Sequence, residues 1–323
     1  MKKPFLLSVI IPVYYEEAVV EACYQELKRV MLYNEWQYEF IFVNDGSKDR
    51  TLEILRALSA KDKNVKVIDF SRNFGHQIAV TAGLFHCNGE VAVVIDADLQ
   101  DPPYVIEKMI EKWQEGYDVV YAKRKKRKGE TLFKLLSAKY FYRLLHYMSE
   151  TEIPMDTGDF RLLNRKVIEA FKQMPERNRF VRGMVSWVGF DQTYIEYERE
   201  ERFAGETKYP LKKMLRFASD GMISFSTKPL KLVRSLGFLT LLIAIMLLVY
   251  SLASKFIFHS VVSGWTSLMV AITFFSGVQL FSIGLLGEYI ARIYDESKNR
   301  PLYLIKEKIN CSSSQGEEQI NIK

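Results

Sequence analysis

The first half of the chain alternates between short apolar runs and longer segments in which apolar residues recur every three or four positions. The apolar runs predict four buried strands, at 6–11, 38–43, 65–70 and 91–95. Helices are expected between them, at about 17–32, after Asp45-Gly46, and up to about His86. Strands that alternate with helices in this way predict a doubly wound parallel α/β sheet.

The pattern becomes less regular after residue 115. A strand is expected within 117–128, which ends in six consecutive basic residues, and another at 193–197. A turn at Asp156–Asp159 precedes a helix at 165–174. Amphipathic helices are expected at 132–148 and 211–226. For the first of these, a position in the membrane interface and packing on the sheet are equally compatible with the pattern.

Two later segments, 236–253 and 264–286, carry almost no charge, and each approaches the roughly 20 residues needed to cross a bilayer. Neither is N-terminal, so neither is a signal peptide. Basic residues flank the pair on its outer sides, which predicts a hairpin with both ends in the cytoplasm. We therefore expect a multi-pass protein of the cytoplasmic (inner) membrane. Its parts would be a catalytic domain with interfacial helices (1–230), a hairpin (231–295, with spans at about 236–254 and 264–287) and a cytoplasmic C-terminal tail (296–323).

Charge and cysteine content narrow the class of partner. The net charge of the 323 residues is +6, and basic residues gather at 123–128, 208–216 and 228–234, close to the apolar segments. An anionic headgroup or a phosphorylated lipid is therefore a better candidate partner than nucleic acid. The three scattered cysteines do not make a disulfide framework and fit a reducing cytosol.

Candidate chemistry lies where the predicted strands end. Asp96 and Asp98 directly follow the most apolar strand, while Glu16 and Asp45 follow two others. Because the carboxyl ends of parallel strands meet in one crevice, these side chains are expected to lie together. Neighbouring carboxylates suit Mg²⁺ or Mn²⁺ held jointly with a substrate diphosphate. No Gly-x-Gly-x-x-Gly or Walker motif occurs, so metal and cationic side chains would have to bind the diphosphate.

Six ordered motifs carry a resemblance to known enzymes. They are Ser8-Val-Ile-Ile-Pro-Val-Tyr, Val43-Asn-Asp-Gly-Ser, Arg72-Asn-Phe-Gly, Asp96-Ala-Asp-Leu-Gln-Asp-Pro-Pro, Asp156-Thr-Gly-Asp-Phe-Arg-Leu and Arg202-Phe-Ala-Gly-Glu-Thr-Lys. Over roughly residues 5–300 the chain resembles the family 2 glycosyltransferases, most closely the polyprenyl-phosphate group that includes dolichol-phosphate mannose synthases and bactoprenol glucosyltransferases. The resemblance implies a GT-A fold and a nucleotide-sugar donor. One departure is Asn44, where many members have a second Asp, and it is expected to alter a contact to the base.

The resemblance also implies roles for individual residues. Nucleotide-sugar binding is expected from Pro12, Tyr14, Glu16, Val43, Asp45, Asp96, Ala97, Gln100, Arg202 and Lys208. Catalytic roles are expected for Asp98, Arg124, Asp156 and Asp159, with Asp98 and Asp96 as ligands of the metal. Asp156 and Asp159 are both candidates for a carboxylate near the acceptor. A phosphate monoester is largely dianionic at neutral pH, so this Asp is expected to position the acceptor more than to remove a proton.

These inferences predict an inverting transfer of one sugar from a nucleotide sugar to a polyprenyl (undecaprenyl) phosphate. UDP-glucose and UDP-N-acetylglucosamine are the expected donors, with GDP-mannose as the alternative, and homo-oligomerisation is left open. A processive polysaccharide synthase would need more spans and a Gln-x-x-Arg-Trp segment, which is absent. A membrane-tethered nucleotide-binding scaffold without chemistry is the alternative of another class.

Overall fold

The computed structural model describes residues 4–125, 157–198, 228–256 and 264–311. The chain divides into two compact units. The first, here called the sheet domain, comprises Met1–Ala138, Thr151–Leu211 and Arg300–Lys323, and the second, the helical unit, comprises Lys139–Glu150 and Lys212–Asn299.

The sheet domain contains one mixed sheet of eight strands. They are β1 (Leu6–Val13), β2 (Gln37–Asn44), β3 (Val65–Phe70), β4 (Val91–Val94), β5 (Val119–Arg124), β6 (Thr157–Asn164), β7 (Gln192–Tyr197) and β8 (Ile305–Ile309). Their order across the sheet is β7-β5-β6-β4-β1-β2-β3-β8. The helices of this domain are α1 (Val20–Tyr33), α2 (Thr51–Lys61), α3 (His76–His86), α4 (Val105–Gln114), α6 (Arg165–Lys172) and α7 (Val181–Trp187).

The predicted parallel sheet is present as β4-β1-β2-β3, in which every neighbouring pair is parallel. The predicted end of the first strand at residue 11 is wrong, because β1 continues through Pro12 to Val13. Pro12 has no N–H to donate, yet it fits here because the pairing of β1 with β4 already ends at Ile10. The β1 strand is therefore longer than its sequence suggests.

Two antiparallel strands make the sheet mixed rather than purely parallel. Strand β6 lies between β4 and β5 and is antiparallel to both, and β8 is antiparallel to β3 at the edge. The sequence predicted only a turn before the helix at 165, because Asp159 and Arg161 interrupt the apolar run. Both side chains are buried on one face of β6, and Phe160 and Leu162 belong to the core cluster on the other.

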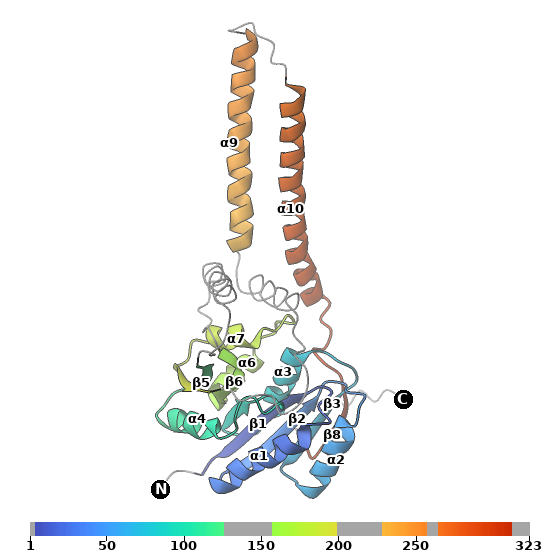
Figure 1. Ribbon diagram of the computed structural model, residues 1–323, viewed down its shortest axis with the longest axis vertical. Helices are drawn as coiled ribbons and strands as arrows, with labels where there is room; N and C mark the ends of the chain where they lie inside the picture. Colours follow the sequence, from blue (N-terminus) through green and yellow to red (C-terminus); the bar gives the residue numbers. More distant parts are fainter. Residues whose placement is uncertain (1–3, 126–156, 199–227, 257–263, 312–323) are drawn as a thin grey trace. The chain divides into compact units, whose positions relative to one another are not determined.

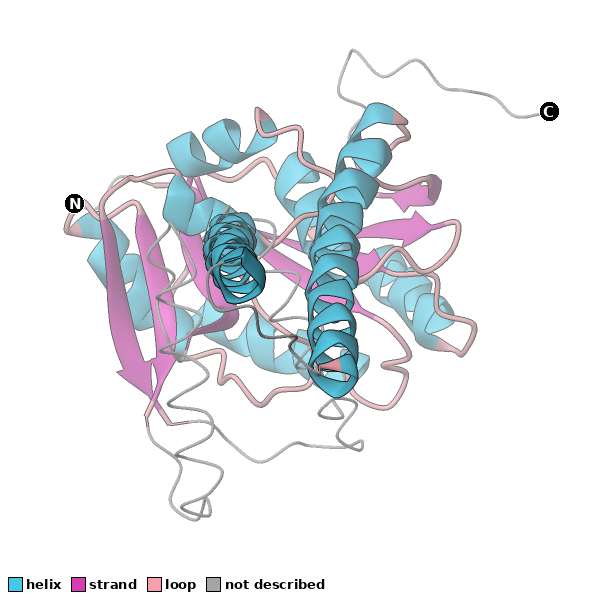
Figure 2. Ribbon diagram, turned by 90° about the horizontal axis from the view of Figure 1, so that it is seen from above, coloured by secondary structure: helices cyan, strands magenta, loops and turns pink. Residues whose placement is uncertain are grey.

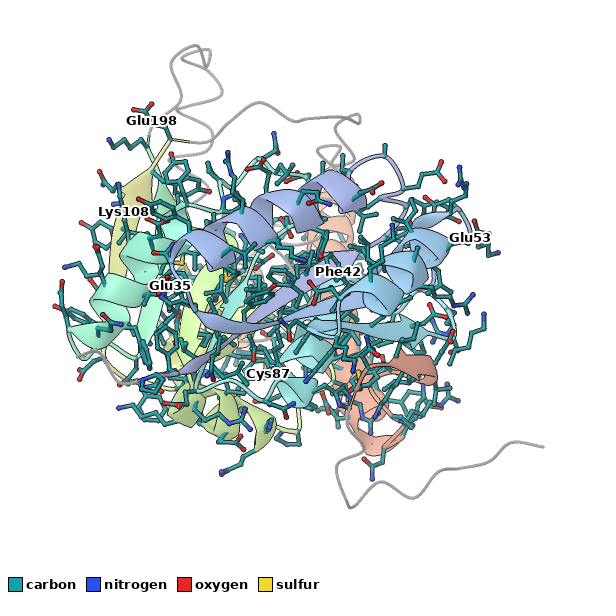
Figure 3. All side chains as sticks on the ribbon, turned by 90° about the horizontal axis from the view of Figure 1, so that it is seen from below. Glu35, Phe42, Glu53, Cys87, Lys108 and Glu198 are labelled. Atoms are coloured by element: carbon teal, nitrogen blue, oxygen red, sulfur yellow. The ribbon has the colours of Figure 1, made fainter. Side chains whose placement is uncertain are left out.

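Helices cover both faces of the sheet (Figures 1 and 2). One face packs against α1, α2 and α4, and its core includes Leu7, Leu27 and Met109. Helix α3 packs on the other face with α6 and α7. Phe42 lies in the interior between these layers, whereas Glu53 projects from the outer side of α2 (Figure 3).

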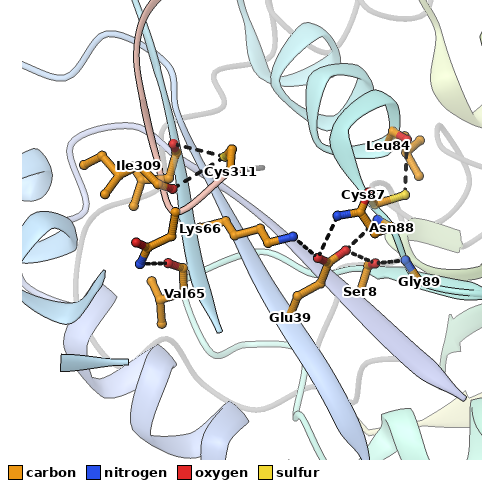
Figure 4. A network of polar contacts seen from close by, with 12 residues as sticks. Ser8, Glu39, Val65, Lys66, Leu84, Cys87, Asn88, Gly89, Ile309 and Cys311 are labelled. Carbon is orange, nitrogen blue, oxygen red and sulfur yellow. Dashed lines mark hydrogen bonds and ion pairs between the residues drawn. The ribbon is translucent and has the colours of Figure 1, made fainter. Parts of the chain in front are cut away.

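A buried polar network joins the amino ends of four strands (Figure 4). The Glu39 carboxylate accepts hydrogen bonds from the Ser8 hydroxyl at 2.5 Å and the Asn88 N–H at 2.6 Å, and it pairs with the Lys66 ammonium. The Ser8 hydroxyl in turn accepts from the Gly89 N–H at 2.8 Å. A Cβ on Gly89 would lie 2.6 Å from that hydroxyl, so only glycine fits there.

The C-terminal segment is more than the tail that was expected. Residues 305–309 form β8, and the sheet domain includes the chain from Arg300 onward. Asn310 donates to the carbonyls of Ser59 and Val65, which fastens the end of β8 to the neighbouring elements. The chain thus leaves the sheet domain before the helical unit and returns to the same sheet after it.

The helical unit contains α9 (Lys228–Phe256) and α10 (Trp265–Ser297), at the positions predicted for the hairpin (Figure 1). By length and composition, Phe274–Ser297 is the one segment of the described residues that qualifies to span a membrane. Within α9, Val233–Ile243 is a shorter apolar stretch. Two spans therefore remain a prediction.

Candidate active site

Strand directions bring most of the predicted residues to one edge of the sheet, here called the functional edge. Strands β1, β2, β3 and β4 all end there. Because β6 is antiparallel to β4, its first residues lie at the same edge, as do the ends of β5 and β7. The order of β3, β2, β1 and β4 places a topological switch point between β1 and β4, which is where open α/β sheets bind ligands.

The end of β1 and the loop after it carry three predicted nucleotide-binding residues. Pro12 is buried, Tyr14 is exposed, and Glu16 is half-buried. Tyr15 has a φ of 56°, and its N–H donates to the Ser47 hydroxyl of the β2–α2 loop at 3.0 Å. The two loops are therefore joined, and the Tyr14 ring is left exposed beside that of Tyr15, with ring centroids 4.6 Å apart.

Asp45 organises the loop after β3. Its carboxylate accepts from the Asn73 amide at 2.8 Å and from the N–H groups of Phe74 at 2.6 Å and Gly75 at 2.9 Å. Burial raises the pKa of Asp45, although the Phe74 and Gly75 N–H groups oppose the rise. Gly46 lies in the turn between β2 and α2, and a Cβ at this position would lie 2.4 Å from the Arg72 carbonyl carbon. The 72–75 loop therefore packs directly on the β2–α2 turn. The expected contact of Asp45 to a base stays a prediction.

The amide of Asn44 points along the sheet to its register partner Asp69. Its Nδ2 donates to the Asp69 carboxylate at 2.7 Å, and both side chains are buried. Burial raises the pKa of Asp69, while this hydrogen bond opposes the rise. An amide therefore satisfies a buried acid here, which gives the departure from the family pattern a structural reason.

The turn after β4 holds the acidic motif. Asp96 and Asp98 are half-buried, and Ala97 and Gln100 are buried. The Asp98 carboxylate accepts from the Gln100 N–H at 3.1 Å, and Leu99 between them has a φ of 56°. Asp101 is fully buried and accepts from the hydroxyl of Tyr197, the last residue of β7. This hydrogen bond joins the turn after β4 to β7, which lies three places away in the sheet.

Asp159 lies at the centre of a polar cluster. Its carboxylate accepts from Arg182 Nε at 2.8 Å and Nη2 at 3.2 Å, from the Gln77 amide at 3.3 Å, and it lies 3.1 Å from His76 Nε2. Burial alone would raise the pKa of Asp159, but Arg182 and His76 outweigh it and hold the pKa well below its usual range. Asp159 is therefore an anion and a weak base.

His76 links Asp159 to Asp96, two carboxylates for which the resemblance implied separate roles. Its Nε2 also lies 3.8 Å from Asp96 Oδ1. Burial would lower the pKa of His76, but the hydrogen bond to Asp159 and the charge of Asp96 raise it to about 9. The imidazole is then a cation at neutral pH, held between two anions.

The carboxylates at the functional edge affect one another's pKa values. Burial raises the pKa of Asp96, His76 lowers it, and Asp159, Asp101 and Asp98 raise it further. Burial also raises the pKa of the Cys23 thiol on α1, with added effects from the charges of Asp98 and Glu16. The ends of β1 and β4 are therefore close enough to share one electrostatic environment.

The donor set fits a hard divalent cation. Asp96 and Asp98 offer carboxylate oxygens in an anionic cluster, and Mg²⁺ sites in nucleotide enzymes commonly use one or two carboxylates plus substrate phosphates. Within the described ranges, no group of three or more His, Cys, Asp or Glu side chains is arranged to hold a metal. Substrate oxygens would thus have to complete the coordination.

Some of the predicted site residues lie outside the part of the chain that the structure describes. Asp156, Arg202 and Lys208 fall outside the described residues, as do the expected interfacial helices. Arg124 ends β5 at the functional edge, in register with Tyr197, and only its backbone is described. Their roles stay predictions.

No sequence motif predicted a role for His76, Gln77 or Arg182, which surround Asp159 in the structure. A signal existed for the first two, because they directly follow the Arg72-Asn-Phe-Gly motif and begin α3. Arg182 lies on a short helix 23 residues beyond Asp159, and no local pattern connects the two.

Comparison with known proteins identifies the family. The glycosyl transferase family 2 model matches residues 8–171, and the GtrB C-terminal hairpin model matches residues 228–293. The chain belongs to glycosyltransferase family 2. The fold is a GT-A-type domain, as the motifs predicted, followed by a two-helix hairpin, as the apolar segments predicted.

Relatives match over nearly the whole chain. The Bacillus subtilis (strain 168) protein named uncharacterized glycosyltransferase YkcC is 56% identical over 95% of this chain and 95% of its own. The Synechocystis protein named uncharacterized glycosyltransferase sll0501 is 46% identical over 93% and 95%. The Shigella phage SfV bactoprenol glucosyl transferase is 42% identical over 93% and 98%.

Proposed function

We propose that this protein is an inverting glycosyltransferase that moves a single sugar from a nucleotide sugar to a polyprenyl phosphate at the cytoplasmic face of a membrane. The observation that carries the proposal is the convergence of Asp45, Asp96, Asp98 and Asp159 at one edge of a family 2 sheet domain. Relatives named bactoprenol glucosyl transferase support a polyprenyl phosphate as the acceptor. UDP-glucose and UDP-N-acetylglucosamine are the proposed donors.

The acceptor phosphate oxygen would form a bond to the anomeric carbon while the bond from that carbon to the nucleoside diphosphate breaks. The leaving diphosphate takes the bonding electrons, and a single displacement inverts the anomeric configuration. The acceptor is already a dianion at neutral pH, so no proton has to be removed. Asp159 is suited to this chemistry as an orienting anion, since its low pKa makes it a poor general base.

A divalent ion bound at Asp98, beside Asp96, would neutralise charge on the leaving diphosphate. Arg202 and Lys208, which follow β7 along the chain, are proposed to approach the same diphosphate. The N–H groups of Phe74 and Gly75 and the side-chain amide of Asn73 are already directed at Asp45, so their part is to hold the loop rather than to bind phosphate.

A membrane hairpin with both ends in the cytoplasm is proposed for α9 and α10. The division of the chain supports it, because Thr151–Leu211 before the two helices and Arg300–Lys323 after them both belong to the sheet domain. A single folded domain lies on one side of a membrane, so an even number of crossings must separate the two segments. This arrangement would bring a soluble domain to a lipid that does not leave the bilayer.

The test is transfer by the full-length protein in detergent. It would be incubated with Mg²⁺, undecaprenyl phosphate and, separately, radiolabelled UDP-glucose, UDP-N-acetylglucosamine and GDP-mannose. Label should move to the lipid from one UDP-sugar. Transfer from GDP-mannose alone would replace the proposed donor, and absence of transfer from all three, with nucleotide still bound, would favour the scaffold hypothesis.

A further inference from the structure

The segment that follows α10 returns to the functional edge beside the loop that Asp45 holds. Phe70, the last residue of β3, is in register with Ile305. The Ser71 N–H donates to the Leu304 carbonyl at 2.9 Å. The Tyr303 ring stacks on Phe70, with centroids 5.1 Å apart and planes 20° from parallel. Residues 303–305 therefore border the point where the 71–75 loop begins.

The contacts continue from Tyr303 into that loop and into α3. Phe70 packs edge-on against Phe74 at 5.6 Å, and the Phe74 N–H donates to Asp45. The Tyr303 hydroxyl lies 3.3 Å from Nε2 of His86, the last residue of α3. Asp45 thus holds the 71–75 loop from one side, and Tyr303 and Leu304 hold it from the other.

The 71–75 loop has little support of its own, because it contains Gly75 in an unusual backbone conformation and leads into a helix without a side-chain cap. Gly75 has a φ of 103°, a conformation that glycine adopts freely in the unfolded chain as well, so ordering it costs conformational entropy. No side chain caps the N-terminus of α3, which starts directly after it with His76. Contacts at both sides of the loop therefore determine the position of His76 and of the start of α3.

We propose that Tyr303 and Leu304 are positioning residues for the donor half of the site. They hold the 71–75 loop so that Asp45, Asn73 and His76 keep the arrangement that binds nucleotide. The residues that follow the second apolar helix are then an integral part of the donor site, not a tail. The identity of the ligand rests on the proposed function, whereas the control of the loop does not.

The test compares Tyr303→Ala with Asn310→Ala in the full-length protein. The first removes the ring contact with Phe70 at the functional edge and the hydroxyl contact with His86. The second removes the two hydrogen bonds that fasten the opposite end of β8. Tyr303→Phe keeps the ring and serves if the alanine variant does not fold. Hydrogen–deuterium exchange of amides 71–78, the Kd of UDP and GDP with Mg²⁺, and steady-state transfer are measured for each.

In Tyr303→Ala, amides 71–76 should exchange faster, and both the nucleotide Kd and the donor KM should rise about fivefold, with kcat and acceptor KM nearly unchanged. Tyr303→Phe should show a smaller shift in the same direction. Asn310→Ala should leave all of these at wild-type values. Unchanged exchange and Kd in Tyr303→Ala, or an equal effect of Asn310→Ala, would overturn the proposal. If wild type binds neither UDP nor GDP, the proposed function fails, and the exchange data still decide the role of Tyr303.

Discussion

The two ends of the same sheet both contain buried acids but treat them differently. At the amino end, burial would raise the pKa of Glu39, but Lys66, Ser8 and the Asn88 N–H lower it below its usual value. At the functional edge, burial raises the pKa of Asp96 and the neighbouring carboxylates add to the rise, although the cation His76 opposes it.

The difference distinguishes an acid that stabilises the fold from acids that form a site for a ligand. A buried carboxylate with one cation and hydrogen bonds to its oxygens has its charge balanced within the fold. A cluster of carboxylates that raise one another's pKa costs stability and is typical of a site that a cation and substrate complete. Substitutions at the two ends should therefore affect different measurable properties.

The largest effect is expected from Asp98→Asn. Loss of the negative charge should weaken metal binding and reduce transfer roughly 100- to 1000-fold, since metal ions contribute several kcal/mol to such reactions. The melting temperature should change little or rise, because one repelling charge is removed. Steady-state transfer across a Mg²⁺ titration checks this. Near-wild-type transfer would contradict the proposed metal ligand.

Glu39→Gln should show the opposite behaviour. The glutamine retains hydrogen bonding, but Lys66 loses its partner, so the free energy of unfolding should fall by about 2 kcal/mol. The donor KM at low temperature should stay at the wild-type value. Chemical denaturation and transfer kinetics on the same preparation test both expectations, and a changed KM with unchanged stability would reverse the comparison.

The ion pair between Glu39 and Lys66 also predicts that stability depends on pH. Because the folded pKa of Glu39 is lowered, its contribution to stability is present above the unfolded value, about 4.3, and is lost as pH falls through the folded pKa. The stability difference between wild type and Glu39→Gln should therefore shrink on acidification below about pH 4.3. Denaturation curves from pH 7 to pH 3 measure it, and a constant difference would mean that charge is not involved.

His76→Gln tests the link between Asp96 and Asp159. The amide can still donate to Asp159 but carries no charge, so both acids lose a cation. Transfer should fall about tenfold, as is usual when a group that orients a catalytic residue is replaced. The control is His86→Gln at the other end of α3, where the glutamine can still hydrogen-bond to the Tyr303 hydroxyl, so kcat should stay within about twofold. Equal losses in the two variants would point to damage to the helix.

The smallest effect is expected from Asn44→Asp. The introduced carboxylate would face Asp69 across 2.7 Å, and the free energy of unfolding at pH 7 should fall by about 1 kcal/mol. The two acids would share a proton at lower pH, so the loss should diminish below about pH 5. Thermal unfolding across pH gives the answer. A large loss of nucleotide affinity instead would support the original expectation that this position contacts the base.

The sequence alone determined what depends on neighbouring residues. The parallel strands, the acidic ends of β1, β2 and β4, and the apolar helices follow from local periodicity and from where each run stops. Asp96 and Asp98 were identified because they directly follow a buried strand. The motif order was sufficient to indicate the family, which the comparisons confirmed.

Only the tertiary structure decided which distant groups meet. Strand β6 was hidden because its buried face carries Asp159 and Arg161, whose partners come from other elements. His76 lies 83 residues before Asp159, and Tyr303 lies 217 residues after His86. Pairing across such separations depends on strand order and direction, which no local pattern of apolar and polar residues encodes.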